Sequence, residues 1–289
     1  MHPPSHPFDL VILDLDGTII DLFRHGAISA RVQHTIAAVQ ATGVPVTIGT
    51  GRTLDYIRQH MYHLGVTQPV IAVQGAVIGD PMTGHILHAT TIPLASARQI
   101  AQWIDASTYI AAFYFNDSAG RTRIYQNRLP DHPVDHEFHE HVFGGPRTIQ
   151  PAFADLLRAA DVAPPLKFII DNDPQLTDDI VPALQARFGN ELHITRTHPR
   201  LVEGTALGVD KGQGVRHLCA ILGIDPQRVL AIGDNDNDIA MLATVGFGVA
   251  MGNATPGVKA VAQWIAPTVG EDGAAVALER WILDSSRSR

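Results

Sequence analysis

Aspartates gather at two points of the chain where a short apolar run ends. Asp14 and Asp16 follow the first run, and Asp234 and Asp238 follow the second. A single aspartate in such a place is usually a turn or helix-capping residue. Two tight acidic clusters, each at the end of an apolar run, favour a shared function instead. Neighbouring carboxylates can divide the work of a nucleophile and a general acid or base.

The same carboxylates predict a metal site. Clustered carboxylates repel one another, and burial strengthens the repulsion, so a cation must compensate. The sequence contains one cysteine, which excludes a multi-cysteine metal cage, and neither acidic cluster contains a histidine. Hard oxygen ligands suit Mg²⁺, which is also held by substrate phosphate. We therefore expect a magnesium site that involves Asp14, Asp16, Asp234 and Asp238.

Lys211 and the loop around Thr50 predict an anion site. Lys211 follows Asp210, a good N-cap, so it falls in the first turn of a helix, where the helix dipole disfavours a cation. An anion shared with the helix N-terminus explains the placement, and a solvated surface lysine is the alternative. Thr50 lies between Gly49 and Gly51, where a hydroxyl and backbone N–H groups form a small anion nest, or else a simple glycine turn.

The segments that must position these groups alternate between strand and helix over the first 80 residues. Val11–Leu13, Val44–Ile48 and Val70–Val73 are short apolar runs typical of strands buried in a parallel sheet, and helical spacing separates them. Strands that alternate with helices predict a parallel sheet covered on both faces. Because reactive loops lie at the carboxyl ends of such strands, both acidic clusters and the Thr50 loop should meet at one crevice.

A middle segment departs from this alternation of strands and helices. Alternating strands such as Tyr109–Phe115 and Lys167–Asp171 are mixed there with helices, and proline and histidine are frequent. The first rhythm then returns, with a further buried strand at Val229–Ile232. We predict an α/β fold: a doubly wound, Rossmann-like parallel-sheet core formed by residues 1–84 and 201–289, with an α+β cap domain inserted at residues 85–200.

The composition excludes several classes of function. Hydrophobic residues make up 45% of the 289 residues and charged residues 17%, so the chain can bury a sizeable core and is not disordered. The net charge of −8 argues against nucleic acid or an anionic membrane as the main partner. No apolar stretch reaches spanning length, and we expect a soluble, cytoplasmic protein. A dinucleotide fingerprint and a P-loop are both absent.

Four motifs in order resemble those of the haloacid dehalogenase superfamily of aspartate-nucleophile phosphohydrolases, and its Cof-like branch in particular. The first is DxDGT, the second is Thr-Gly-Arg, the third is Lys-Gly, and the fourth is GDxxNDxxML; they start at Asp14, Thr50, Lys211 and Gly233. The middle segment matches only by its length and position, which resemble the large α/β cap of that branch. One departure is Gln74, where the branch usually has asparagine, and a substrate contact by this residue stays open.

The resemblance implies a role for each residue of the site. Asp14 would attack phosphorus and form an aspartyl-phosphate, while Asp16 would protonate the leaving oxygen and then take a proton from water. Mg²⁺ would be held by the side chains of Asp14 and Asp234 and by the backbone carbonyl of Asp16. Asp238 would support the ion from its outer coordination shell. The groups implied to bind the phosphoryl oxygens are Thr50, Gly51, Lys211 and Asn237.

The expected function is therefore Mg²⁺-dependent hydrolysis of a small phosphate monoester, such as a sugar phosphate or a similar metabolite. A phosphomutase or phosphotransferase on the same fold stays open, because the sequence does not show whether water or a hydroxyl group receives the phosphoryl group. A non-catalytic protein that binds a phosphometabolite is a third possibility, although the presence of both Asp14 and Asp16 argues against it. We expect the cap to enclose the site and to set substrate specificity.

A histidine-rich stretch of the middle segment, residues 131–141, could also bind a transition metal. His136 and Glu140 stand four residues apart, but Pro133 interrupts the stretch and no HExxH order occurs. We interpret this stretch as a solvated part of the cap.

Overall fold

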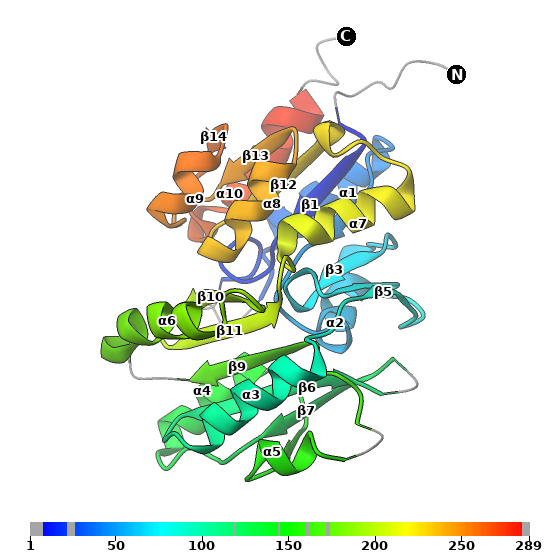
Figure 1. The fold of residues 1–289 in the computed structure, drawn as a ribbon. Coiled ribbons are helices and arrows are strands. Elements are labelled where there is room, and N and C mark those ends of the chain that lie inside the picture. Colours follow the sequence, from blue (N-terminus) through cyan, green and yellow to red (C-terminus); the bar gives the residue numbers. More distant parts are fainter. Residues whose placement is uncertain are drawn as a thin grey trace.

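The computed structural model of the chain describes residues 8–21, 27–117, 120–143, 145–159, 162–171 and 174–284. Figure 1 shows two layered bodies, one built from both ends of the chain and the other from its middle. The first body is the core and the second is the cap of the predicted architecture. The described part of the chain contains no helix that is long and apolar enough to cross a membrane.

The core is built on a five-stranded parallel sheet. Its order is β14–β13–β12–β1–β2, and its strands are β1 (Leu10–Leu13), β2 (Val46–Ile48), β12 (Val229–Gly233), β13 (Phe247–Ala250) and β14 (Trp264–Ile265). Leu13 at the end of β1 is in register with Ile48 and with Ile232. The three central strands therefore end at one level, and the loops that follow them meet at the same edge of the sheet.

Helices cover both faces of this sheet, as buried apolar strands require. In Figure 1, α7 and α8 lie in front of the sheet while α1 and α10 lie behind it. The core helices are α1 (Ala30–Ala41), α2 (Leu54–Leu64), α7 (Lys211–Leu222), α8 (Ile239–Thr244), α9 (Pro256–Val261) and α10 (Gly273–Leu278). The α7 helix starts where Asp210 accepts a hydrogen bond from the Gln213 N–H, and it ends at Gly223 in the left-handed conformation.

The cap is built on a six-stranded sheet of order β10–β11–β9–β6–β7–β8, in which all neighbours are antiparallel except β7 and β8. Its strands are β6 (Ile110–Asn116), β7 (Thr122–Gln126), β8 (Arg147–Ile149), β9 (Lys167–Asp171), β10 (Leu192–His198) and β11 (Leu201–Ala206). One face packs against α3 (Leu94–Asp105), α5 (Phe153–Leu156) and α6 (Pro174–Phe188), and the other against α4 (Pro133–Phe143). The predicted fold class is confirmed.

The sheets place the junctions between core and cap a few residues later than the sequence pattern does. A small antiparallel sheet joins β3 (Val70–Ala72), β4 (Val77–Gly79) and β5 (Ile86–Ala89), and a bridge from Gly49 to Ile71 ties it to the core. The β5 strand therefore lies with the core, although it follows residue 85. The β11 strand pairs inside the cap sheet, although it follows residue 200. We propose domain boundaries near residues 90 and 206, because strand pairing assigns each segment to the core or to the cap, whereas the sequence pattern does not mark these boundaries.

Candidate active site

Three aspartates form a compact acidic cluster at the edge where the core strands end. One carboxylate oxygen from each of Asp14, Asp234 and Asp238 lies within 4.8 Å of the others, and Asp14 and Asp238 are buried. Among the residues that the structure describes, no other group of three or more His, Cys, Asp or Glu side chains is arranged to hold a metal ion. The oxygen-only donor set fits the predicted Mg²⁺. The Asp16 carboxylate is not part of this cluster.

The loop after β1 is shaped around Asp234. The Thr18 hydroxyl lies 3.4 Å from Asp234 Oδ1, and Asn253 Nδ2 donates a hydrogen bond of 3.2 Å to Oδ2. Gly17 has a positive φ of 83°, and a Cβ at this position would lie 2.2 Å from Asp234 Oδ2. Only glycine allows the backbone to approach this closely, which explains the residue after Asp16 in the first motif.

Asp238 connects the acidic loop to Lys211. Its Oδ2 accepts backbone hydrogen bonds from Asp234 (2.9 Å) and Asn235 (3.0 Å), and its Oδ1 accepts one of 2.6 Å from Lys211 Nζ. Both carboxylate oxygens are thus engaged inside the protein. This arrangement supports the implied role of Asp238 as a residue that orients the site.

Lys211 lies inside the cluster. Only 1% of Lys211 is exposed, and its Nζ donates hydrogen bonds of 2.6 Å to both Asp14 Oδ1 and Asp238 Oδ1. Burial opposes its charge, but the two carboxylates outweigh that effect and raise the pKa of Lys211 above its ordinary value. The alternative of a solvated surface lysine is therefore wrong. Gly212 lets α7 reach this depth, because a Cβ there would lie 2.5 Å from the Ala240 carbonyl oxygen.

One lysine does not neutralise three aspartates. Burial and then the charge of Asp238 raise the pKa of Asp14 to about 7, although Lys211 works in the opposite direction. Burial and the charge of Asp14 likewise raise the pKa of Asp234 well above its ordinary value. Carboxyl groups with raised pKa values hold protons that a divalent cation would replace, so the electrostatics of the site also fit a bound Mg²⁺.

Asp16 points to a different partner. Arg52 Nε donates a hydrogen bond of 2.7 Å to Asp16 Oδ2, and Arg52 Nη2 donates one of 2.9 Å to Oδ1. The Asp16 side chain keeps 25% of its surface exposed. The Arg52 guanidinium also stacks 4.6 Å above the ring of Tyr56 and donates a hydrogen bond of 3.3 Å to the Val142 carbonyl of α4 in the cap. Arg52 stands in the second motif, but no sequence pattern predicts that it pairs with Asp16.

The Thr50 loop is more tightly bonded than an open anion nest. Thr50 is buried, and the N–H groups of Gly49 and Thr50 donate to the carbonyls of Leu13 and Ile71. These two amides complete the sheet edge and are not available to an anion. The Thr50 hydroxyl accepts a hydrogen bond of 3.2 Å from the Arg52 N–H and can still donate to an anion.

Gln74 stands beside the Thr50 loop in a strained backbone. It is buried with φ 60° and ψ 26°, and Val73 before it also has a positive φ of 53°. Non-glycine residues adopt this conformation at a cost, and such positions cluster at functional sites. Gln74 Oε1 accepts a hydrogen bond of 2.9 Å from Asn237 Nδ2, while Asn237 Oδ1 is buried without a hydrogen-bond partner among the described residues. A Cβ on Gly51 would lie 2.3 Å from Gln74 Nε2, so these residues are in close contact.

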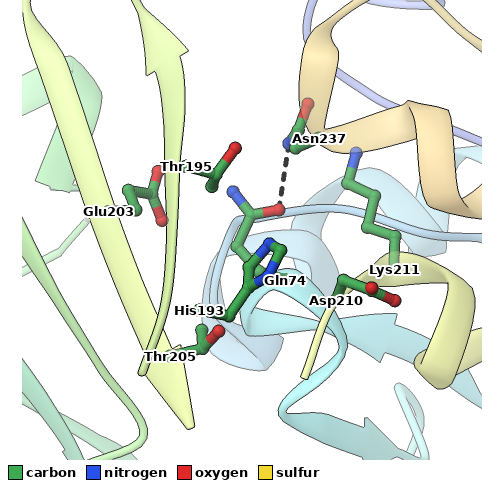
Figure 2. Close-up of a pocket in the computed structure, with 8 residues that line it drawn as sticks. All are labelled: Gln74, His193, Thr195, Glu203, Thr205, Asp210, Lys211 and Asn237. Carbon is green, nitrogen blue, oxygen red and sulfur yellow. Dashed lines mark hydrogen bonds between the residues drawn. The ribbon is translucent and has the colours of Figure 1, made fainter. Parts of the chain in front are cut away.

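A pocket opens next to Lys211, between the core and the cap (Figure 2). The space inside it and at its open mouth is about 250 Å³. The core lines it with Gln74, Asp210, Lys211 and Asn237, and strands β10 and β11 of the cap line it with His193, Thr195, Glu203 and Thr205. The predicted phosphate-binding residues Lys211 and Asn237 therefore face a chamber whose opposite wall belongs to the cap.

Direct contacts hold the cap against the site. Lys167 of β9, of which 3% is exposed, donates hydrogen bonds to the Gly51 carbonyl (2.9 Å) and to Glu203 Oε2 (2.7 Å). Asn235 Nδ2 of the core donates one of 2.7 Å to the Thr197 carbonyl of β10. Sequence reasoning missed Lys167 and Glu203 because neither stands in a motif, and only the cap sheet brings them to the Thr50 loop.

The histidine-rich stretch is not uniformly solvated. His139 of α4 is buried, with Nε2 2.7 Å from Asp171 Oδ2 and Nδ1 3.2 Å from Gln126 Nε2. Arg200 joins the same group through both oxygens of Asp171. The solvated interpretation is therefore wrong for His139, which fixes α4 to the sheet. The side chains of residues 133, 134 and 141 lie outside the described part of the structure.

Comparison with known proteins connects this geometry to a family. A model of the haloacid dehalogenase-like hydrolases matches residues 11–278. A 5-amino-6-(5-phospho-D-ribitylamino)uracil phosphatase of Bacillus subtilis is 29% identical over 279 residues, which cover 95% of this chain and 96% of the relative. A phosphoglycolate phosphatase of Methanopyrus kandleri is 29% identical over 276 residues, which cover 94% of this chain and 96% of the relative.

Solved structures show the same fold. The structure of a haloacid dehalogenase-like hydrolase from B. subtilis superposes with a TM-score of 0.80 and covers 94% of this chain and 99% of its own. Its sequence is 24% identical, so this likeness concerns the fold alone.

Proposed function

Because the chain belongs to the haloacid dehalogenase-like hydrolases and is a phosphatase, we propose that it hydrolyses a small phosphate monoester with Mg²⁺ and an aspartyl-phosphate on Asp14. The observation that carries this proposal is the cluster of Asp14, Asp234 and Asp238, because Lys211, which bonds two of them, also lines a pocket between core and cap. Carboxylates and a lysine so arranged can hold a cation and a phosphoryl group next to a nucleophile.

Asp14 is assigned the attack on phosphorus. Lys211 holds its Oδ1, so we assign the attack to Oδ2, which forms a bond to phosphorus while the bond from phosphorus to the ester oxygen breaks. Asp16 gives its proton to that leaving oxygen. A water molecule then attacks the phosphorus of the aspartyl-phosphate, and Asp16 takes a proton from that water. The bond from phosphorus to Asp14 breaks, which releases phosphate and restores the free Asp14 carboxylate.

The residues assigned to hold Mg²⁺ are Asp14, the backbone carbonyl of Asp16 and Asp234, with Asp238 in support. When bound, the ion would neutralise charge on the carboxylates and on the phosphoryl oxygens, so that a phosphate dianion can approach Asp14. The groups assigned to the phosphoryl oxygens are Thr50, Gly51, Lys211 and Asn237.

The substrate class follows from the pocket. The pocket between core and cap limits the substrate to a small metabolite, because a folded phosphoprotein or duplex nucleic acid cannot enter a space between two domains. The two relatives described above are named for phosphate esters of small metabolites, a ribitylamino-uracil phosphate and phosphoglycolate. The net charge of −8 also disfavours nucleic acid and anionic membranes as partners, in line with an enzyme of the cytoplasm.

The test is phosphate release from a panel of small phosphate monoesters, including p-nitrophenyl phosphate. We expect release that stops with EDTA, returns with Mg²⁺, and is lost in Asp14→Asn, because an amide is a poor nucleophile and a weaker metal ligand. Asp155→Asn, an exposed aspartate of the cap, is the matched control. Full activity in Asp14→Asn or after exhaustive chelation would contradict the proposal. Release only when an acceptor hydroxyl is supplied would indicate a phosphotransferase.

A further inference from the structure

Glu203 is a buried carboxylate on the cap wall of the pocket. Only 5% of the residue is exposed, yet it lines the pocket opposite Lys211 and Asn237 (Figure 2). Its Oε2 accepts a hydrogen bond from Lys167, and its Oε1 accepts one of 2.8 Å from the Thr197 hydroxyl. An ionised carboxylate offers about four acceptor positions, so Glu203 retains capacity to accept hydrogen bonds from a ligand.

The charges around the pocket disfavour the binding of a second anionic group on the substrate. Lys211 is the single lysine or arginine among the lining residues, all of which the structure describes, and Asp14 and Asp238 already share it. Lys167 behind the wall is engaged by Glu203 and by the Gly51 carbonyl. A carboxylate or second phosphate on the organic part of a substrate would therefore meet Glu203 without a cation to receive it, and like charges in contact strongly disfavour binding.

The neighbours of Glu203 suit neutral donor groups. Thr195 and His193 project from β10 on the same wall, and both can donate or accept a hydrogen bond. The residues that line this pocket are all of polar or charged types, and two of them, Glu203 and Asp210, are acidic. Hydroxyl groups supply the donors that a buried carboxylate requires.

We propose that Glu203 is the specificity-determining residue of this phosphatase: it accepts hydrogen bonds from hydroxyl groups of a neutral, polyol-like organic part and rejects phosphate esters that carry a second anionic group. This inference rests on the proposed phosphate-ester hydrolysis at the same site. Lys167 is the positioning residue that pairs with the Glu203 carboxylate inside the cap and attaches it to the Thr50 loop.

The test compares two substrates that differ in one group. Glycerol 3-phosphate has a hydroxymethyl group where 3-phosphoglycerate has a carboxylate. We expect the wild-type enzyme to prefer glycerol 3-phosphate in kcat/KM by at least about tenfold. If neither compound is turned over, the same preference is read from their inhibition constants against p-nitrophenyl phosphate hydrolysis.

Variants assign the preference to Glu203. Glu203→Gln should lower or reverse the preference for glycerol 3-phosphate. The amide can still accept a hydrogen bond from Lys167, but it does not neutralise the charge of that ammonium group. Lys167→Met combined with Glu203→Gln removes both charges and should abolish the preference without reversing it. Glu137→Gln, an exposed glutamate of α4, is the matched control and should keep the wild-type preference. Circular dichroism confirms that each variant is folded.

The outcomes separate this inference from the proposed function. A wild-type enzyme that hydrolyses p-nitrophenyl phosphate but treats the pair equally, prefers 3-phosphoglycerate or binds neither compound would overturn the role of Glu203, and no variant is needed for that result. A preference that survives in both folded Glu203 variants would overturn it as well. A wild-type protein that releases phosphate from no ester would instead contradict the proposed function itself.

Discussion

Arg52 holds both carboxylate oxygens of Asp16, with Nε 2.7 Å from Oδ2 and Nη2 2.9 Å from Oδ1. A guanidinium that binds a carboxylate through two parallel hydrogen bonds fixes the plane of that carboxylate as well as its position. Because Arg52 also donates to the Val142 carbonyl, this pair links the proposed general acid of the core to helix α4 of the cap. Arg52 therefore contacts the proposed general acid and the cap at the same time.

Replacement of Arg52 tests this positioning role. Arg52→Lys keeps a positive charge but cannot hold both oxygens of Asp16, so we expect kcat for p-nitrophenyl phosphate to fall by roughly 10²-fold with a smaller change in KM. Steady-state kinetics measure both constants. Arg31→Lys is the matched control, because Arg31 makes the same two-bond contact with Glu279 on the surface. Equal losses in the two variants, or an unchanged kcat in Arg52→Lys, would contradict the role.

Lys211 should matter for stability as well as for binding. From the sequence alone, Lys211→Met is expected to weaken phosphate binding with little loss of stability. The structure places Lys211 between two buried carboxylates, and removal of one partner of a buried ion pair costs about 3–5 kcal/mol. Urea unfolding in EDTA should show a loss of that order, and Mg²⁺ should recover part of it. Lys259→Met serves as the control, because the Nζ of Lys259 donates a hydrogen bond only to a backbone carbonyl in the contacts that the structure shows. A Lys211→Met protein as stable as wild type would show that the contacts with Asp14 and Asp238 carry little energy.

The ion pairs of Asp171 predict how stability depends on pH. Burial alone would raise the pKa of Asp171, but hydrogen bonds from His139 and Arg200 outweigh it and lower this pKa below its ordinary value of 3.8. A carboxyl group with a lowered pKa stabilises the fold above the unfolded value, and this contribution is lost as the pH falls through the folded value. Asp171→Asn should therefore lower the free energy of unfolding by about 2 kcal/mol at pH 6, and by progressively less below pH 3.8.

Thermal or urea unfolding between pH 2 and pH 6 measures that difference. Asp155→Asn removes an exposed aspartate that pairs with Arg158, and such a pair contributes about 0–1 kcal/mol. A difference between wild type and Asp171→Asn that stays constant over this pH range would show that the ionised Asp171 is not what stabilises the cap.

The sequence was most informative where chemistry and strand order coincide. Asp14 and Asp234 each follow a short buried strand, and parallel pairing brings such strand ends together, so their meeting could be predicted. Lys211 was recognised because a cation in the first turn of a helix needs an anion to explain it. These inferences depend on local pattern and on one general rule of parallel sheets.

Residues of the cap were beyond the same reasoning. Lys167 and Glu203 stand 36 positions apart, on strands β9 and β11, and only the antiparallel register of the cap sheet, which places Lys167 opposite Thr205, brings their side chains into contact. His139 looked solvated because its stretch is polar, yet Asp171 and Gln126 satisfy it in the interior. Polar residues that satisfy one another across strands carry no periodic signal, so their burial follows from tertiary pairing alone.

The central claim is that the phosphoryl group passes through Asp14. The most direct measurement mixes Asp16→Asn with a substrate and Mg²⁺, quenches the reaction in acid, and maps the modified peptide by mass spectrometry. Loss of the general acid and base should slow turnover by about 10²–10⁴-fold and leave the phosphoryl group on the enzyme. The account predicts one phosphoryl group on Asp14 that hydroxylamine removes. A phosphoryl group on any other residue, or unimpaired turnover with no phosphorylated enzyme at all, would contradict it.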